Sequence, residues 1–175
     1  GNFSAQNITT ASNNTGIGTY TLVANTADNN TAVGYYALNV NTTGVENVAV
    51  GSQALASNTT ASQNTAVGYY ALQANTEGVE NVAIGWAALD ACTTGIENTA
   101  VGTSALSAST TASENTAVGR MALRVNTSGT RNTALGHQTL ISNTTGNDNV
   151  AVGSRTATGI TSGYRNTALG TYAMQ

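Results

Sequence analysis

The sequence of 175 residues has no lysine and no proline, and only 7% of its residues are charged. Typical soluble domains carry about 25% charged residues. The usual helix formers Glu, Lys, Gln and Arg are therefore scarce, which leaves isolated helices with little support. The formal net charge of −3 argues against a nucleic acid partner, because binding to phosphates needs clustered Lys and Arg.

Cysteine is nearly missing as well. Cys92 is the only one, which excludes an intrachain disulfide framework and a cysteine-based zinc site. No apolar run approaches the roughly 18 residues of a membrane span, so we expect no membrane insertion within this segment. No signal peptide pattern opens the chain, and its first residue is Gly1 rather than Met. We expect a processed chain or a segment of a longer fibre.

What the sequence does contain is one motif, Asn-x-Ala-x-Gly, at a fixed interval. The interval is 17 residues throughout, except that the first copy precedes the second by 16. The copies begin at Asn14, Asn30, Asn47, Asn64, Asn81, Asn98, Asn115, Asn132, Asn149 and Asn166. Residues 1–13 fit the end of a preceding repeat, so residues 1–175 form one continuous repeat array.

A unit of this length is too short for a helix–turn–helix pair, and its Thr-Ala-Val-Gly stretch alternates with period two. We predict an all-β protein, a β-solenoid (β-roll) of about ten 17-residue coils. Each coil is expected to hold two or three short strands. Coils stacked at about 4.8 Å would form a rod roughly 45–50 Å long, with equivalent residues in ladders along it.

Counting from its Asn, each repeat has positions 1 to 17, and the invariant positions have structural explanations. A buried position-1 Asn column, which includes Asn30, Asn47, Asn64 and Asn81, can pass amide hydrogen bonds from coil to coil. Glycine at position 5, as in Gly34, Gly51, Gly68 and Gly85, supplies a backbone angle that other residues reach only with strain. We expect Val, Ile or Leu at position 4 and Leu at position 9 to fill the interior, with Ala at positions 3 and 8 keeping a face narrow.

A coil of 17 residues buries little apolar surface, and neither end of the array resembles a cap. Solenoids need stacked neighbours and protected ends. We therefore expect that the native chain continues beyond this segment and that several chains bury a shared face.

Asn30–Leu38, which reads NTAVGYYAL, and the following Asn41-Thr-Thr-Gly-Val-Glu46 resemble repeats of phage tail-fibre proteins. They also resemble a lengthened head repeat of the YadA-like trimeric autotransporter adhesins, with Asn81-Val-Ala-Ile-Gly85 the nearest match. The resemblance covers the whole chain. It implies a left-handed β-roll, three chains side by side, and an extracellular adhesive or spacer role. The adhesin repeat is shorter, so the cross-section of the coil does not carry over.

Positions 6 and 7 vary most and hold eight of the nine aromatic residues. Rings and polar tips suit contacts with sugars or a receptor. The alternative is that the rings fill a gap between chains or stack on each other. Because adjacent strand residues point to opposite faces, one tyrosine of each pair is expected to pack and the other to be exposed. The candidate ligand-binding residues are Tyr35, Tyr36, Tyr69, Tyr70, Trp86, Arg120 and His137.

Position 17 is the charged column, with Glu80, Glu97 and Glu114 in succession and alternating signs after them. The simplest explanation is that these carboxylates are solvated at an exposed turn. The alternatives are a bound calcium ion and ion pairs with another chain. Because no calcium-loop motif is present, we predict no metal site. Sequons occur at position 12, which suggests glycosylation as an alternative to chance in an Asn- and Thr-rich repeat. They begin at Asn41, Asn58, Asn126 and Asn143, and further ones begin at Asn7, Asn13 and Asn29.

The sequence does not favour an enzyme, since His137 is the only histidine and no Ser or Cys is paired with a base. We expect no cofactor. The favoured function is a non-enzymatic extracellular fibre segment, at the cell surface or on a virion, for adhesion or host attachment. Its expected partners are further copies of itself and a cell-surface glycan or protein receptor. The alternatives are a purely structural, glycosylated extracellular filament and, more remotely, an ice-binding solenoid based on threonines at positions 13 and 14.

Overall fold

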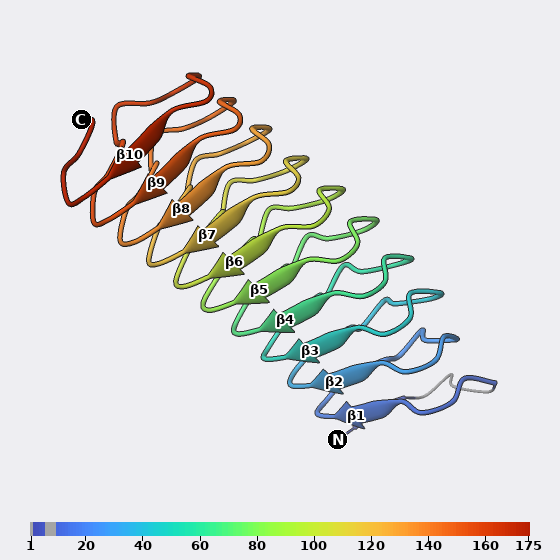
Figure 1. The fold of residues 1–175 in the computed structure, drawn as a ribbon. Coiled ribbons are helices and arrows are strands. Elements are labelled where there is room, and N and C mark those ends of the chain that lie inside the picture. Colours follow the sequence, from blue (N-terminus) through green and yellow to red (C-terminus); the bar gives the residue numbers. More distant parts are fainter. Residues whose placement is uncertain (1, 6–9) are drawn as a thin grey trace.

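The computed structural model describes residues 2–5 and 10–175, and shows a stack of coils advancing in one direction (Figure 1). Residues 1 and 6–9 of the partial first repeat, with the sequon at Asn7, lie outside the described part. Each coil contributes one three-residue strand. The strands are β1 (Thr15–Ile17), β2 (Thr31–Val33), β3 (Val48–Val50), β4 (Thr65–Val67), β5 (Val82–Ile84), β6 (Thr99–Val101), β7 (Thr116–Val118), β8 (Thr133–Leu135), β9 (Val150–Val152) and β10 (Thr167–Leu169).

The ten strands form one parallel sheet in chain order, from β1 to β10. Position 3 of each strand pairs with position 3 of the next, as Ala66 does with Ala83. The register therefore repeats the 17-residue period of the sequence, and the predicted all-β solenoid is confirmed. The expectation of two or three strands per coil was wrong, because the rest of the coil turns too sharply to be extended.

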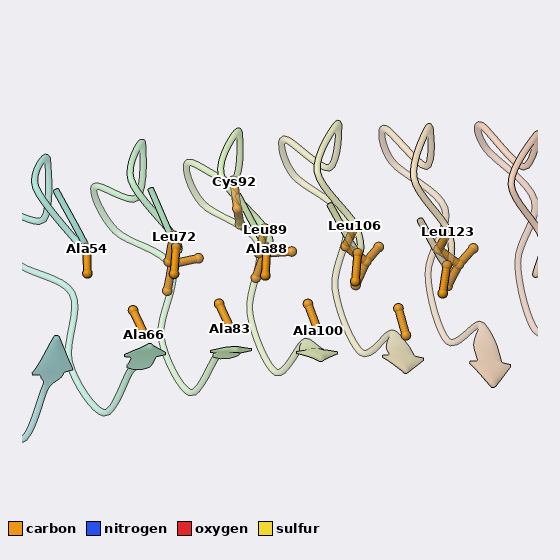
Figure 2. Packing of buried hydrophobic residues seen from close by; sticks show 14 of the residues in the cluster. Ala54, Ala66, Leu72, Ala83, Ala88, Leu89, Cys92, Ala100, Leu106 and Leu123 are labelled. Atoms are coloured by element: carbon orange, nitrogen blue, oxygen red, sulfur yellow. The ribbon is translucent and has the colours of Figure 1, made fainter. Parts of the chain in front are cut away.

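The interior is narrow and is filled by Ala and Leu. Alanines on the strands, such as Ala66 and Ala83, face leucines from the opposite side of the coil, such as Leu72 and Leu89 (Figure 2). The position-9 leucines from Leu22 to Leu140 are fully buried, and burial of one leucine is worth about 1.5–3 kcal/mol. The space opposite them is narrow, which explains Ala at position 3, while position 8 is Ala in most coils and a buried threonine at Thr21, Thr139 and Thr156.

The expectation that position 4 fills the interior was wrong. Since side chains alternate along a strand, an inward position 3 sends positions 2 and 4 outward. Ile17 is 60% exposed, Ile84 39% and Leu135 46%. The apolar residues of position 4 therefore form an outer row, not part of the core.

The turns depend on left-handed backbone at three non-glycine positions of each coil. In the coil that begins at Asn64, these are Tyr70, Leu72 and Glu80, with φ of 60°, 53° and 58°. Such residues cost about 1–2 kcal/mol each, so the stack must hold them in place. It does so by hydrogen bonds to neighbouring coils: Tyr70 N–H donates to Ser52 O, and Leu72 N–H donates to Ala88 O.

Position 5 needs glycine for two reasons. Gly68 has φ of 140°, and a Cβ there would lie 2.4 Å from the carbonyl oxygen of Gly85 in the next coil. Gly34, Gly51 and Gly85 are in the same situation, with φ between 133° and 138°. The coils approach each other at this corner more closely than any side chain allows.

Two columns of buried asparagine hold the coils together. At position 1, the Oδ1 of Asn47 accepts from both the backbone N–H and the Nδ2 of Asn64, and this pattern continues through Asn81 to Asn166. From Asn30 to Asn149, each Nδ2 also donates to a position-15 carbonyl, as Asn64 does to Gly78 O at 2.9 Å. This arrangement matches the amide ladder expected from the sequence. It satisfies polar groups that would be costly to bury unpaired.

Candidate functional site

The side chains of positions 6 and 7 lie together on one edge of the solenoid, which we call the aromatic edge. It begins immediately after the position-5 glycine corner. Tyr35 and Tyr36 have ring centroids 4.5 Å apart, and Tyr69 and Tyr70 4.0 Å apart. The expectation that the two tyrosines of a pair point to opposite faces was wrong, because position 7 has left-handed and not strand backbone. Their exposure does differ: Tyr35 and Tyr69 are exposed, whereas Tyr36 and Tyr70 are half-buried.

Near the N-terminal end, the position-7 rings stack from coil to coil. Phe3 and Tyr20 are parallel, with centroids 5.1 Å apart, and Tyr20 lies 4.9 Å from Tyr36. Tyr35 meets Tyr20 edge-on at 6.3 Å. Aromatic pairs of this kind contribute about 0.5–1.5 kcal/mol beyond their burial. The position-7 rings thus form a base that supports the position-6 rings from behind.

Where position 7 is not aromatic, amides continue the contacts. Gln53 donates from Nε2 to the Tyr70 hydroxyl at 3.3 Å, and Gln73 donates to Gln53 Oε1 at 2.9 Å. Gln73 occupies position 10, so side chains of position 10 reach the same edge from the following coil. Position 10 was not singled out in the sequence because its residue type varies too much to look like a column.

The other candidate residues continue the same edge toward the C-terminus. Trp86 is 54% exposed, and its position-7 neighbour Ala87 is buried, so the indole has no ring behind it. Arg120 and His137 lie in consecutive coils, with Nη1 3.2 Å from Nε2. The structure therefore brings all seven candidate binding residues onto one edge, but spreads them over seven coils. Five of these coils carry them, with Tyr35 and Tyr36 in one and Tyr69 and Tyr70 in another, and they do not converge on one point.

Position 17 lies at a different corner and carries most of the acidic residues. Glu46 accepts from Gln63 Nε2 at 3.2 Å, while Glu80, Glu97 and Glu114 are exposed. Arg131 forms an ion pair with Asp148, with Nε 2.7 Å from Oδ1. The hydrogen bond from Arg131 lowers the pKa of the Asp148 carboxyl and the same contact raises the pKa of Arg131. Within residues 2–5 and 10–175, no group of three or more His, Cys, Asp or Glu residues is placed to hold a metal ion.

The glycosylation interpretation of position 12 does not fit the folded coil. Asn41, Asn58, Asn126 and Asn143 are all fully buried. Asn41 Nδ2 donates to Asn25 Oδ1 at 2.6 Å and to Gly44 O at 2.9 Å, and Asn58 repeats this pattern with Asn41 and Ala61. The amide nitrogen that would carry a sugar is used inside a second asparagine ladder.

That second ladder has a break in the middle of the rod. Cys92 and Ser109 occupy position 12 in consecutive coils, both fully buried. Ser109 Oγ has no hydrogen-bond partner in the described part of the chain. Burial raises the pKa of the Cys92 thiol to about 11, partly offset by a hydrogen bond with the backbone of Gly95. A buried, protonated thiol is a poor nucleophile.

The threonines of position 13 are used in the stack too. Thr42 Oγ1 donates to Thr59 O at 2.8 Å, and this bond recurs from coil to coil as far as Thr144, which donates to Thr161 O at 3.0 Å. Their donor hydrogens are therefore engaged between coils and are not presented as a free array, which weakens the basis of the ice-binding alternative.

The surface that sequence reasoning missed is the outer face of the sheet, which we call the strand face. It consists of the outward positions 2 and 4 of the ten strands, and every residue on it is Thr, Val, Ile or Leu. No charged residue interrupts it. The signal was present in the alternation Thr-Ala-Val, but alternation alone does not say which of its two sets of side chains lies inside.

No pocket is found over residues 2–5 and 10–175, and none of these residues belongs to a helix that could cross a membrane. The aromatic edge, the position-17 corner and the strand face are therefore the surfaces that we consider for binding. Comparisons of the chain with family models, curated proteins and solved structures gave no match.

Proposed function

We propose that this chain is a non-enzymatic segment of an extracellular attachment fibre, at a cell surface or on a virion. In this proposal three copies lie side by side with their strand faces buried between them, and the aromatic edge of each copy faces outward. The number of copies follows from the resemblance of the repeats to trimeric adhesins. The burial of the strand face rests on the chemistry of that face.

One observation carries the proposal: the position-4 row of the strand face is apolar along its whole length, and no charged residue stands beside it at position 2. Position 4 presents Ile17, Val33, Val50, Val67, Ile84, Val101, Val118, Leu135, Val152 and Leu169 in one unbroken row. Contiguous exposed apolar surface of this kind marks interaction sites. A narrow coil with a single Leu per turn also gains the interior it lacks when a second apolar layer covers this face.

The experiment on assembly replaces two neighbouring residues of the strand face, Ile84→Asp and Val101→Asp. Copies that associate through this face should separate, because two buried carboxylates per chain carry a large desolvation cost. Sedimentation would then show a lower mass, with the β signature of circular dichroism retained. Thr94→Asp, at an exposed turn, is the control and should leave the mass unchanged. If the double variant keeps the wild-type mass, the strand face is not the interface.

The experiment on attachment removes the three exposed rings of the aromatic edge, Tyr35→Ala, Tyr69→Ala and Trp86→Ala. Flat rings supply most of the contact area for a sugar or a receptor, so binding to cells and to a glycan array should fall about tenfold or more. Tyr164→Ala is the matched control, since Tyr164 is 70% exposed but lies outside the edge. Equal binding by the triple variant and the control would contradict the proposal.

A further inference from the structure

Charge is divided sharply along the rod. Seven of the eight carboxylates precede residue 115, and no arginine does. The remaining three full coils, which begin at Asn115, Asn132 and Asn149, hold all five arginines and His137 against the single carboxylate of Asp148. The rod therefore has an acidic N-terminal part and a basic C-terminal part.

The arginines of the basic part fall on two different edges. Arg131 and Arg165 occupy position 17, where Asp148 lies between them in the stack. Arg131 is bonded to it by Nε and Nη2, at 2.7 and 3.4 Å, and the charge of Arg165 also lowers the pKa of Asp148. The positive charge of this edge is partly neutralised by its own carboxylate.

The other three arginines are Arg120 and Arg155, which lie on the aromatic edge at positions 6 and 7, and Arg124 at position 10. Arg120 Nη1 is directed at His137 Nε2. Arg155 donates from Nε to Gln138 Oε1 at 3.0 Å and from Nη1 to the Tyr172 hydroxyl at 3.5 Å. In the described part of the chain, the Arg131–Asp148 contact is the one ion pair, so none of these three guanidinium groups is paired with an acid.

We assign Arg124 to the same cluster from its place in the coil. It is exposed and occupies position 10, and a position-10 side chain reaches the position-7 side chain of the preceding coil, as Gln73 does with Gln53. Two guanidinium groups, an imidazole and two neutral hydrogen-bonding side chains thus line the aromatic edge over adjacent coils, and Arg124 is exposed at position 10 of the same coil as Arg120. We call Arg120, Arg124, His137 and Arg155 the basic cluster.

Guanidinium forks match the geometry of carboxylate and sulfate groups, which they bind through two parallel hydrogen bonds. Arg120 and Arg155 are two coils apart, which is about 10 Å along the rod axis and close to the length of two linked hexoses. In the other direction the same edge carries Trp86 and Tyr69, whose flat faces suit neutral sugar rings. A polysaccharide bound along the edge would contact aromatic rings toward the N-terminal end and cationic side chains toward the C-terminal end.

We propose that the basic cluster binds an acidic glycan, a polysaccharide that bears sulfate or carboxylate groups and runs along the aromatic edge. This inference rests on the proposed attachment function and names its ligand class. The acidic part of a second copy is the competing occupant. It is less favoured because parallel copies in register place like-charged parts side by side and leave the basic cluster free.

The test measures binding of the full chain to immobilised dextran sulfate, carboxymethyl dextran and unmodified dextran at physiological salt. We expect the sulfated or the carboxylated polymer to bind more tightly than dextran, and the stronger of the two identifies the acidic group. Arg120→Gln with Arg155→Gln should weaken that binding about tenfold or more, since charge-assisted hydrogen bonds to the acidic groups are lost. Both side chains are exposed, so melting should change little.

The matched control is Arg131→Gln with Arg165→Gln, which removes the same charge from the same two coils but from the other edge. Binding of this control to the acidic polymer should weaken by less than about threefold, because the substitutions reduce only the long-range electrostatic attraction between chain and polymer. An equal loss in the two double variants, or the absence of binding to both acidic polymers, would overturn the inference. Salt-sensitive self-association that disappears only in the Arg120 and Arg155 variant would overturn it in favour of a second copy. After an equal loss or an absence of binding, an unchanged particle mass, with Tyr35, Tyr69 and Trp86 still required for attachment, would leave the proposed function standing. After the self-association outcome, a particle mass that stays at three chains in high salt would do the same.

Discussion

The Oδ1 atom of Asn30 accepts two hydrogen bonds from Asn47, one from the backbone N–H at 3.0 Å and one from Nδ2 at 3.2 Å. These residues are 17 apart in the chain and adjacent in the stack. The same pair of bonds recurs at every later coil, so one residue per repeat ties side chain and backbone together along the rod. Stability in such an array is a sum of interfaces between neighbours, and each broken link should be measurable.

The first prediction concerns the centre of this ladder. Asn64→Ala leaves the backbone N–H of Asn81 without its acceptor and removes one of the two hydrogen bonds accepted by Gly78 O and by Asn47 Oδ1. A buried group without a partner costs about 1–3 kcal/mol and each further lost hydrogen bond about 0.5–1.5 kcal/mol, so we expect the free energy of unfolding to fall by about 3 kcal/mol. Chemical denaturation measures it. Asn39→Ala, outside the ladder, should cost less than about 1 kcal/mol, and equal effects would contradict the ladder's role.

The second prediction concerns the break at position 12. Cys92→Asn and Ser109→Asn together would join the ladder that ends at Asn75 to the one that begins at Asn126. Each new amide can donate to the preceding Oδ1 and to its own position-15 carbonyl, as Asn58 does. We expect a gain of about 1 kcal/mol for each substitution, seen as a higher denaturation midpoint. Cys92→Ser with Ser109 unchanged adds no ladder bond and is the control; a stabilisation of the same size in this control would contradict the prediction.

The third prediction concerns the acidic column. Glu97 has φ of 56° and is stacked between Glu80 and Glu114, so it combines left-handed backbone with like-charged neighbours. Asn is among the residues that best tolerate this conformation, and Asn13 and Asn29 already share a side-chain hydrogen bond at position 17. We expect Glu97→Asn to stabilise the protein by about 0.5–1 kcal/mol.

The control for Glu97→Asn is Glu77→Asn, which removes a carboxylate at an exposed position of ordinary backbone. It should change the free energy of unfolding little. In high salt the gain of Glu97→Asn should shrink but persist, because screening removes only the charge term. A gain that vanishes entirely in salt would show that the backbone contributes nothing.

The fourth prediction concerns pH. Burial raises the pKa of Asp90 above its ordinary value, against hydrogen bonds from its own N–H and that of Ala91, which lower it. Its Oδ1 is buried without a partner in the described structure. The folded state therefore binds the proton more tightly than the unfolded state, and its stability falls as pH rises from the ordinary aspartate pKa through the raised one.

Denaturation at several pH values tests this in the wild type and in Asp90→Asn, which should lose that part of the pH dependence. Asp148, whose pKa is lowered by Arg131, has the opposite sign: its contribution is present above the ordinary pKa and is lost as pH falls through the lowered one. Asp148→Asn should therefore reduce the loss of stability in acid. If Asp90→Asn leaves the pH profile unchanged, the pKa of Asp90 is the same in the folded and unfolded states, which would contradict the prediction.

The repeat itself made much of this fold predictable. The fixed interval between Asn30, Asn47 and Asn64 implies stacked coils in register, and the invariance of Gly68 and its equivalents implies a backbone that no side chain allows. Sequence could not tell that Val67 points outward and Ala66 inward, because alternation is symmetric between two faces. It also could not reveal the left-handed backbone of Leu72. Leucine disfavours that conformation, and only the bonds to neighbouring coils enforce it.

The candidate site was predictable in composition and not in arrangement. The clustering of aromatics in two columns pointed to the edge. The contact between Tyr69 and Tyr70, and the division of the arginines between two edges, depend on where the chain turns within each coil. Those turns arise from tertiary hydrogen bonding, which propensity does not encode.

The most direct test of the central claim is the mass and shape of the particle in solution, from sedimentation equilibrium with small-angle X-ray scattering. An attachment fibre built by burying strand faces predicts a particle of three times the chain mass of 17.6 kDa, elongated along the stack. A particle of 17.6 kDa at all concentrations tested, with the strand face left in solvent, would contradict it.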